Sequence, residues 1–473
     1  MNMVVMAPVL LAFGALFIAI LLDWRRGLIG LILFLPFAGI ISILAANPLA
    51  VLAKDLLIVA PTYLAYVLTA YRSTPLIRPS PLFLAATGAL IFASVVQLAN
   101  PNLLSMAVGL VGLKVWLFYV PMLLLAGAFV RDGDDLRRLL RIFVVVAPIP
   151  CLVGLAQWLA ATFLGYKFIM FSIYGQMAEN WTQGFTSFQY SAGFSLFRLF
   201  STFAAPAQYF GFAYSMIFVT WIAIRVENAG PWKTYAVASF YLAIAATLLS
   251  GSRQALVFVP FALVLLTVLG RSTSPKAIVA VLLASIAAVP LAFATIPLES
   301  IFFDTSRLVG HYRDTLFFAG LVDALENFPW GLGTGMNTGS ARYVIADPDW
   351  EVFENFYAKA AYEFGVIGPV IVVALFAGLI GAALQLARFG SSPVFGACGA
   401  AFAAFYIAFG VNCLKGWQLD LDPVNVYFWL FAGILFRVRV LASRAAPASP
   451  ARNPFAVGRQ QTVVEVDTQA IGR

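Results

Sequence analysis

Apolar runs of about 20 residues recur from one end of this 473-residue chain to the other, and they constrain the fold more than any other feature. A helix pairs all its backbone groups within one segment, which is what a chain needs in lipid. Hydrophobic residues make up 62% of the chain and charged residues 11%, against roughly 25% charged in an ordinary soluble domain. The sequence therefore predicts an all-α, polytopic membrane helix bundle.

The number of spans follows from the runs that reach the length of a bilayer-crossing helix. We expect about 12–13 transmembrane helices, because the first run can also be read as a re-entrant segment. The expected spans are 5–22, 27–45, 54–71, 82–98, 107–130, 141–164, 204–225, 235–250, 255–270, 277–296, 364–386, 393–413 and 425–440.

The charged connections indicate how the bundle is oriented. They are Asp23–Arg26, Arg72–Arg78, Arg131–Arg141, Arg225–Lys233, Arg271–Lys276, Arg388 and the tail from Arg437. If these connections face the cytoplasm, roughly 19 of the 29 Lys and Arg lie on the cytoplasmic side, as the positive-inside bias requires. The transmembrane domain is then 1–440, with long exterior loops at about 165–203 and 297–363 containing short amphipathic helices, and 441–473 reads as a disordered cytoplasmic tail.

The first exterior loop, 165–203, is rich in Phe, Tyr and Trp. Such residues form belts at the headgroup level of a membrane. They also offer rigid apolar surfaces on which sugar rings or lipid chains stack. Both interpretations stay open on the sequence alone.

The second exterior loop holds most of the polar chemistry. Tyr312–Asn327 has helical spacing, with an apolar face that includes Leu321 and Leu325, and Pro329 followed by Gly331 should end that helix. We expect a surface helix that lies on the bundle.

Arg253 lies in a polar hinge between two apolar runs, beside Ser252. A helix-end arginine can extend to lipid headgroups. A charge beside hydrocarbon is costly, however, and its planar guanidinium matches phosphate oxygens. The second interpretation makes Arg253 and Ser252 an anion-binding pair.

Three further candidates precede the glycine run. Arg313, close to Arg307, can bind substrate or form a solvated salt bridge with Asp314 or Asp323. His311 is the only histidine, so a role as general base competes with a structural one.

Gly331, Gly333 and Gly335 follow a helix and not a strand, so they do not fit a dinucleotide fingerprint. They form a plain turn or present backbone amides to phosphate.

Lys114 and Arg198 are expected at the exterior half of the membrane, and Glu354 opens an amphipathic segment that ends at Glu363. A carboxylate placed like Glu354 can take a proton from a sugar hydroxyl. One histidine, three scattered cysteines and unpaired acids give no ligand spacing, so the sequence predicts no metal site and no cofactor.

Three motifs together resemble a known family. They are Ser250–Ala255 (SGSRQA), Arg313 followed by Phe328–Gly335 (FPWGLGTG), and Glu354–Tyr357 (ENFY) followed by Glu363–Gly368 (EFGVIG). They are similar to motifs of the O-antigen ligase and Wzy-type polymerase superfamily, and Phe197–Phe203 is a looser match. The resemblance covers about 190–370.

The resemblance implies a metal-independent GT-C-like glycosyltransferase of the bacterial inner membrane, with its active site facing the periplasm. Its substrates would be undecaprenyl-diphosphate-linked glycans as donor and acceptor. A chain-length regulator is a candidate partner, and no nucleic acid is expected. Where ligases carry histidine, this chain has Glu354, which favours an O-antigen, capsule or exopolysaccharide polymerase over a ligase.

The resulting hypothesis assigns catalytic roles to Arg253, Arg313 and Glu354. The two arginines would hold the donor diphosphate, and Glu354 would deprotonate the acceptor during inverting transfer. The expected substrate-binding residues are Arg198, Lys114, Ser252, Arg307, His311, Gly333, Gly335, Asn355 and Tyr357. The alternatives are a ligase that transfers glycan to lipid A core and a transporter of polysaccharides or small molecules; no internal repeat of the transporter kind is visible.

Overall fold

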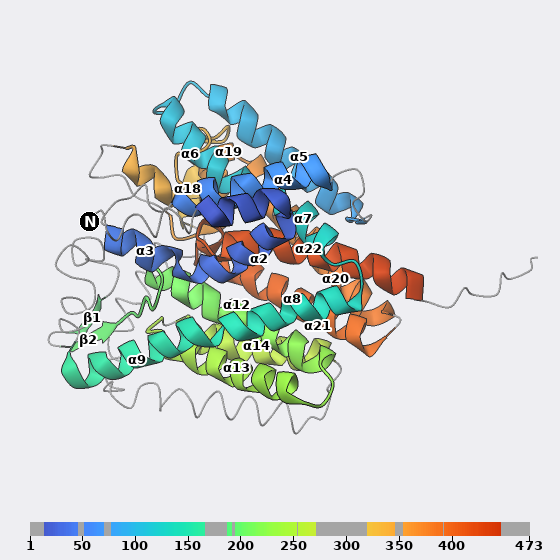
Figure 1. Ribbon diagram of the computed structural model, residues 1–473. Helices are drawn as coiled ribbons and strands as arrows, with labels where there is room; N and C mark the ends of the chain where they lie inside the picture. The colour runs from blue at the N-terminus through green and yellow to red at the C-terminus, as the bar shows by residue number, and fades with distance from the viewer. Residues whose placement is uncertain are drawn as a thin grey trace, which may run out of the picture.

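The computed structural model describes residues 14–45, 52–70, 77–165, 187–191, 194–252, 254–270, 319–345, 353–390 and 392–445. Helices dominate this part of the chain (Figure 1). The first half contains α2 (Trp24–Phe34), η1 (Leu35–Phe37), α3 (Ala38–Ala45), η3 (Asp55–Val59), α4 (Ala60–Thr69), α5 (Pro81–Val96), η5 (Gln97–Ala99), α6 (Met106–Leu117), α7 (Met122–Phe129), α8 (Gly133–Val146), α9 (Pro148–Leu164), β1 (Ser187–Ser191) and β2 (Phe194–Phe197).

The second half begins after the short antiparallel β1–β2 hairpin. It contains α12 (Pro206–Val226), α13 (Pro231–Leu248), α14 (Ala255–Leu269), α18 (Ala319–Asn327), η7 (Gly339–Tyr343), α19 (Phe356–Phe364), α20 (Ile367–Phe389), α21 (Pro393–Asn412), η8 (Gln418–Asp420) and α22 (Val424–Ala445). Here η3 is a π-helix and the other η elements are 3₁₀ helices.

The predicted membrane bundle is confirmed. Among the described residues, eight helices are long and apolar enough to cross a membrane, and the protein is a multi-pass membrane protein. They are 24–43, 81–99, 106–129, 133–164, 206–226, 367–389, 393–412 and 424–445. Two shorter apolar helices, Asp55–Thr69 and Ala255–Leu269, join them. The expected span 277–296 lies outside the described residues.

The helices α12, α21 and α22 form the centre of the bundle. They pass through the middle of the view in Figure 1, with α5 and α6 to one side and α13 and α14 to the other. Aromatic rings pack between α21 and α22: the ring centroids of Phe405 and Phe431 are 5.1 Å apart, and those of Tyr406 and Phe428 are 5.5 Å apart. Such close apolar packing is what holds helices together where lipid already solvates hydrocarbon.

Two helix boundaries differ from the sequence-based expectation. The charged stretch 131–141 was expected as a loop, but α8 begins at Gly133 because the Asp132 side chain accepts hydrogen bonds from the amides of Asp134 and Asp135. The polar face of α8 is exposed, while residues such as Leu139 and Phe143 are buried. The charged residues of 131–141 therefore belong to the exposed face of the first turns of an amphipathic helix.

The end of α22 is the second of these boundaries. Helix α22 continues to Ala445, although the disordered tail was expected from 441. Within α22, the Nε of Arg437 donates to the carbonyl of Val130 at 2.7 Å and an Nη donates to that of Arg131 at 2.8 Å. These bonds satisfy carbonyls at the end of α7 and hold α22 against it.

One predicted loop helix is confirmed over its described part. Within 312–327 the structure describes α18 from Ala319, and this helix ends at Asn327, just before Pro329. It lies against α19.

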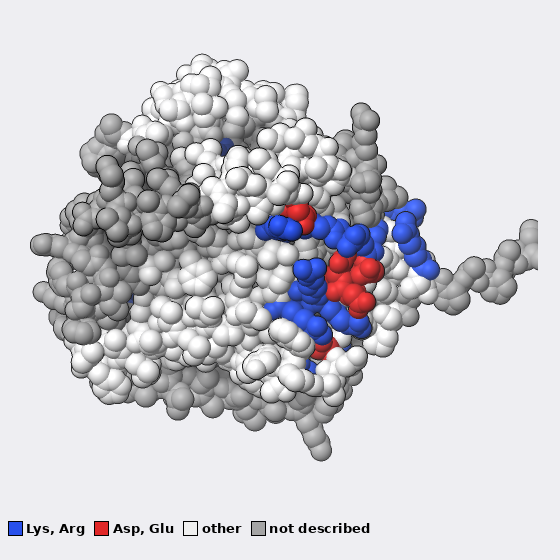
Figure 2. All heavy atoms as spheres, viewed as in Figure 1, with Lys and Arg blue, Asp and Glu red and all other residues white. Residues whose placement is uncertain are grey.

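On the face drawn in Figure 2, most of the visible charged side chains gather on the right of the view, next to a largely uncharged surface. In this region Arg141 holds Glu227 through two hydrogen bonds of 2.6 and 2.8 Å. Helix α12 has 21 residues and rises about 32 Å from Pro206 to this charged end, about the hydrocarbon thickness of a bilayer.

Candidate functional site

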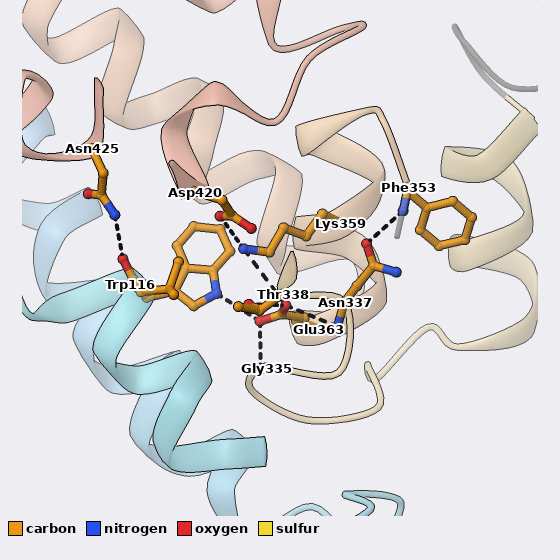
Figure 3. A network of polar contacts seen from close by, with 10 residues as sticks. Trp116, Gly335, Asn337, Thr338, Phe353, Lys359, Glu363, Asp420 and Asn425 are labelled. Carbon is orange, nitrogen blue, oxygen red and sulfur yellow. Dashed lines mark hydrogen bonds and ion pairs between the residues drawn. The ribbon is translucent and has the colours of Figure 1, made fainter. Parts of the chain in front are cut away.

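A buried carboxylate, that of Glu363 near the end of α19, organises the polar interior (Figure 3). It accepts hydrogen bonds from the indole Nε1 of Trp116 at 2.7 Å and from the amide of Gly335 at 2.8 Å. The amide of Asn337 at 3.1 Å and the hydroxyl of Thr338 at 2.9 Å complete the set. Four donors therefore offset the cost of burying the charge.

The glycine run is shaped around this carboxylate. Gly331, Gly333 and Gly335 all have positive φ, at 79°, 114° and 90°. A Cβ on Gly335 would lie 2.2 Å from the carbonyl oxygen of Val108, and one on Gly112 would lie 2.3 Å from the nitrogen of Gly335. Only glycine permits this conformation and this close approach of α6.

The expected role of Gly333 and Gly335 as phosphate ligands is not what the structure shows. The amide of Gly335 donates to the Glu363 carboxylate, and the amide of Gly333 donates to the Glu363 carbonyl at 3.3 Å. Both amides thus have an internal partner, so the turn anchors α19 to α6.

A buried lysine lies next to this network. The Nζ of Lys359 forms an ion pair with Asp420 of η8, and it lies 3.9 Å from Glu363 Oε1 and 4.4 Å from the Trp116 ring centre. Lys359 is 0% exposed. Burial raises the pKa of the Asp420 carboxyl to about 6; Lys359 opposes this rise, and the negative charge of Glu363 adds to it.

A second charge cluster surrounds Asp422, two residues after Asp420. Lys54 Nζ is 3.0 Å from Asp55 Oδ1 and 2.7 Å from Asp422 Oδ2. Lys114 Nζ is 3.0 Å from Asp55 Oδ2, and the Tyr119 hydroxyl donates to Asp55 Oδ1 at 2.6 Å. Two cations and two anions balance, as burial of charge within a bundle requires.

Both clusters fix the connection between α21 and α22, residues 413–423. Asp420 is held by Lys359 and Asp422 by Lys54. The connection is therefore a fixed part of the bundle and a firm support for whatever its exposed side chains bind.

A small polar pocket opens beside this connection. It is lined by Arg198, Pro206, Ala207, Phe210, Ser252, Gln254, Glu354, Lys415, Gly416, Trp417 and Gln418. These residues come from the starts of α12, α14 and α19 and from the connection itself. The pocket combines two cations, a carboxylate, amides and an indole.

Backbone hydrogen bonds tie the walls of this pocket to each other. The amide of Leu199 donates to the carbonyl of Ser250 at 3.0 Å, which links the Arg198 strand end to the turn before α14. The amide of Phe356 donates to the carbonyl of Cys413 at 2.9 Å, which links the start of α19 to the connection. Segments far apart in sequence therefore form one rim.

The segment that carries Arg198 is also fixed from behind. Gln157 of α9 accepts from the amide of Ser201 at 2.8 Å and donates to its carbonyl at 3.0 Å. Phe200 and Phe203 are 3% and 2% exposed. These two aromatics of the first exterior loop are thus core residues, and for them both expected roles, belt and stacking platform, are wrong.

Three of the predicted site residues meet in the pocket. Arg198, Ser252 and Glu354 all line it, although 156 positions separate the first from the last. Arg253 lies outside the described residues, between Ser252 and Gln254, which both line the pocket. Arg307, His311 and Arg313 also lie outside the described residues.

Three other predicted residues have partners inside the protein. Lys114 pairs with Asp55 in the buried cluster. Asn355 is the N-cap of α19: its Oδ1 accepts from the amides of Tyr357 at 2.9 Å and Ala358 at 3.1 Å. The Tyr357 hydroxyl donates to the carbonyl of Gly410 at 2.8 Å. These side chains stabilise the site's surroundings.

The sequence analysis missed the residues that build the interior. Lys54, Asp55, Lys359, Asp420 and Asp422 were not singled out. A usable signal was present, since ionisable residues in or beside apolar runs mark functional or paired sites. Lys415 and Trp417 were missed because they lie outside the region that resembles the family. Among the described residues, no group of three or more His, Cys, Asp or Glu could hold a metal ion.

The fold and the site define a multi-pass helical membrane protein. Its polar pocket lies at the start of α12, and its charged end lies at the other end of that helix. No protein-family model matches the chain, and no curated protein matches it.

Proposed function

We propose that the protein is a membrane glycosyltransferase that polymerises undecaprenyl-diphosphate-linked repeat units into a surface polysaccharide. The observation that carries the proposal is the pocket that Arg198, Ser252 and Glu354 share with Lys415. It offers cations for a diphosphate and a carboxylate for a hydroxyl within one space. The motif resemblance supports the same reaction class.

Glu354 is the proposed general base. Its side chain is exposed at the start of α19, so it can reach a substrate from solution or from the membrane surface. In the proposed step it takes the proton of the acceptor hydroxyl, whose oxygen bonds to the anomeric carbon of the donor. The bond from that carbon to the diphosphate oxygen breaks, and undecaprenyl diphosphate leaves with the electron pair. Attack from the side opposite the leaving group inverts the anomeric centre.

The cations stabilise the leaving diphosphate in this proposal. Arg198 and Lys415 line the pocket, and Arg253 and Arg313 are assigned to the same task by the sequence motifs. A preorganised cation acts on charge that develops in the transition state, so removal of one should lower the rate on the order of 10²-fold.

The proposed location is the bacterial inner membrane, with the pocket at the periplasmic face. The charged end of the bundle carries Arg137 and Arg141 of α8 and Arg437 of α22, and basic residues favour the cytoplasmic side. The pocket lies at the other end of α12, about 30 Å away along the helix. A chain-length regulator is a proposed partner on that face.

The test is a deletion strain complemented with wild type, Arg198→Ala, Arg253→Ala, Arg313→Ala or Glu354→Gln, with lipid-linked and surface glycans resolved by size. Polymerase activity predicts that the variants accumulate single repeat units on polyprenol diphosphate. Glu326→Gln, an exposed carboxylate on α18, is the matched control and should behave like wild type.

Two other results would overturn the proposal. If chains still lengthen but no longer reach lipid A, the protein is a ligase. If every variant makes normal glycans at normal expression, glycosyl transfer is wrong and a transporter becomes the leading hypothesis.

A further inference from the structure

The turn before α14 is held by hydrogen bonds and places two side chains at the pocket. The amide of Leu199 donates to the Ser250 carbonyl at 3.0 Å, and the Ser250 hydroxyl donates to the Thr247 carbonyl at 2.7 Å. The amide of Ser252 donates to the Ser250 hydroxyl at 3.3 Å. Ser252 and Gln254 both line the pocket. The turn is therefore a fixed support for contacts with a ligand.

Two neighbouring amide groups fix the orientation of the Gln254 side chain. Asn412 Nδ2, at the end of α21, donates to Gln254 Oε1 at 2.9 Å, and Gln418 Nε2 of η8 donates to the same oxygen at 3.3 Å. Asn412 and Gln418 are 0% and 4% exposed, so both donors lie in the interior. The oxygen of the Gln254 amide is thus held on the inner side, and its NH₂ group lies on the other edge of the amide.

The opposite orientation of this amide is less favourable. If Gln254 Nε2 donated to the two partners, their NH₂ groups would have to take the positions now held by Asn412 Oδ1 and Gln418 Oε1. Both positions are buried and have no hydrogen-bond partner among the described residues. A buried N–H without a partner is rarer than a buried carbonyl oxygen without one. Burial therefore favours the arrangement that has Gln254 Oε1 on the inner side.

This arrangement leaves Gln254 Nε2 as a donor that the protein does not use. Among the described residues it has no hydrogen-bond partner, and unlike Asn412 Oδ1 and Gln418 Oε1 it is not enclosed. Gln254 is partly exposed where it lines the pocket.

An amide NH₂ group requires an acceptor. A diphosphate at neutral pH offers acceptor oxygens and no strong donor, whereas a sugar hydroxyl is donor and acceptor at once. Arg198 and Lys415 line the same pocket, and cations there favour an anionic acceptor. The surroundings of Gln254 Nε2 therefore match a phosphate oxygen.

We infer that Gln254 is a further substrate-binding residue, whose Nε2 donates a hydrogen bond to an oxygen of the donor diphosphate. Asn412 and Gln418 are the positioning residues that orient its amide. The inference rests on the proposed function, and it adds a neutral donor to the cations of the pocket. A donor that is oriented before the ligand arrives strengthens binding because little ordering remains to be done.

The test measures the dissociation constants of two lipids with the purified full-length protein in lipid nanodiscs. One probe is undecaprenyl diphosphate, which carries no sugar, and the other is the lipid-linked repeat unit extracted from the deletion strain. Gln254→Leu should weaken the binding of undecaprenyl diphosphate about 10-fold, the scale of a hydrogen bond to a charged group. The repeat unit contains the same diphosphate, so its affinity should fall by the same factor.

Gln254→Glu separates substrate binding from support of the turn, and it decides the question if Gln254→Leu does not fold. The carboxylate still accepts from Asn412 and Gln418, but it presents an oxygen to the diphosphate in place of an NH₂ group. It should weaken the binding of both lipids more than Gln254→Leu does, with a thermal midpoint close to that of wild type. Gln385→Leu in α20 lies outside the pocket and should match wild type.

Asn412 should act on the ligand only through Gln254. Asn412→Ala removes the shorter of the two bonds that orient the amide and should weaken the binding of undecaprenyl diphosphate about 3-fold. In a Gln254→Leu background the same change should have no further effect on affinity, because no amide remains to be oriented. Equal effects in the two backgrounds would overturn the positioning role of Asn412.

The outcomes are distinguishable. If wild type binds neither lipid, the proposed function fails and takes the inference with it. If wild type binds both lipids and a folded Gln254→Leu keeps the wild-type affinities, the donor role of Gln254 alone is refuted. If Gln254→Glu binds like wild type, Gln254 supports the turn and does not contact the diphosphate. If Gln254→Leu weakens only the binding of the repeat unit, its amide contacts the sugar, and the assignment to the diphosphate is overturned.

Discussion

Trp116 of α6 and Glu363 of α19, 247 positions apart in sequence, are joined by a 2.7 Å hydrogen bond from the indole Nε1 to Oε2. The bond joins two helices that the glycine turn also brings together. Lys359 lies over the same indole ring, so one tryptophan contacts both charges of α19. This group connects the end of the second exterior loop to the bundle that supports the pocket.

Glu363→Gln should destabilise the folded protein, because it removes the charge but keeps the size and shape of the side chain. A neutral amide accepts more weakly than a carboxylate, and its NH₂ group would face donors such as the Gly335 amide. The expected loss is about 2 kcal/mol, typical of hydrogen bonds to a buried charge. It should appear as a lower midpoint of thermal unfolding in detergent. The exposed Glu326→Gln is the control, and equal midpoints for the two variants would contradict the structure.

Gly335→Ala should destabilise more sharply than an ordinary glycine substitution. The residue has φ of 90°, and the new Cβ would lie 2.2 Å from a carbonyl of α6. Strain and overpacking together predict a loss of about 2 to 4 kcal/mol. Gly381→Ala in α20, with nothing within 4 Å of its Cβ, is the matched control and should be neutral or slightly stabilising. The free energies of unfolding in a graded denaturant decide between them.

The helix bundle could be predicted from sequence because bilayer thickness dictates the length of each apolar run. The positions at which a helix breaks inside an apolar run could not be predicted from the sequence. The expected span 107–130 breaks into α6 and α7 just before Pro121, where a proline lacks a backbone donor and disfavours helix in the preceding residue. That break is where Tyr119 donates to Asp55, a contact that no local pattern reveals.

The site residues could be named from motifs, but their arrangement depends on contacts between distant segments. Arg198 and Glu354 were recognised as single charged residues, and only the fold brings them to one pocket. Lys359 was missed because its partner Asp420 lies 61 residues later, so neither residue forms a recognisable local pattern. Charge pairing across a bundle is a property of helix packing.

Lys54→Met tests whether the second cluster is a paired network. The change leaves Asp422 without its lysine, and a buried charge without its partner costs about 3 to 5 kcal/mol. The double variant Lys54→Met with Asp422→Asn removes both charges and should recover part of the loss. A double-mutant cycle from thermal or denaturant unfolding gives the coupling energy. Additive effects of the two changes would show that the pair does not interact.

Asp420 should make the stability of the protein depend on pH. Its folded-state pKa of about 6 lies above the ordinary value of 3.8 for an aspartate, because the carboxyl is buried beside Glu363. Between these two values the folded state holds a proton that the unfolded state has lost. The free energy of unfolding should therefore fall as pH rises from about 4 to about 6, by at most about 3 kcal/mol, and then level off.

The measurement is the free energy of unfolding in detergent across pH 4 to 8 for wild type and Asp420→Asn. The asparagine variant removes the titrating group, so the difference between the two curves isolates it from every other ionisable residue. That difference should change between pH 4 and 6 and stay constant above about 6.5. Parallel curves over the whole range would mean that the Lys359 charge keeps Asp420 ionised throughout, and that burial is fully offset by the ion pair.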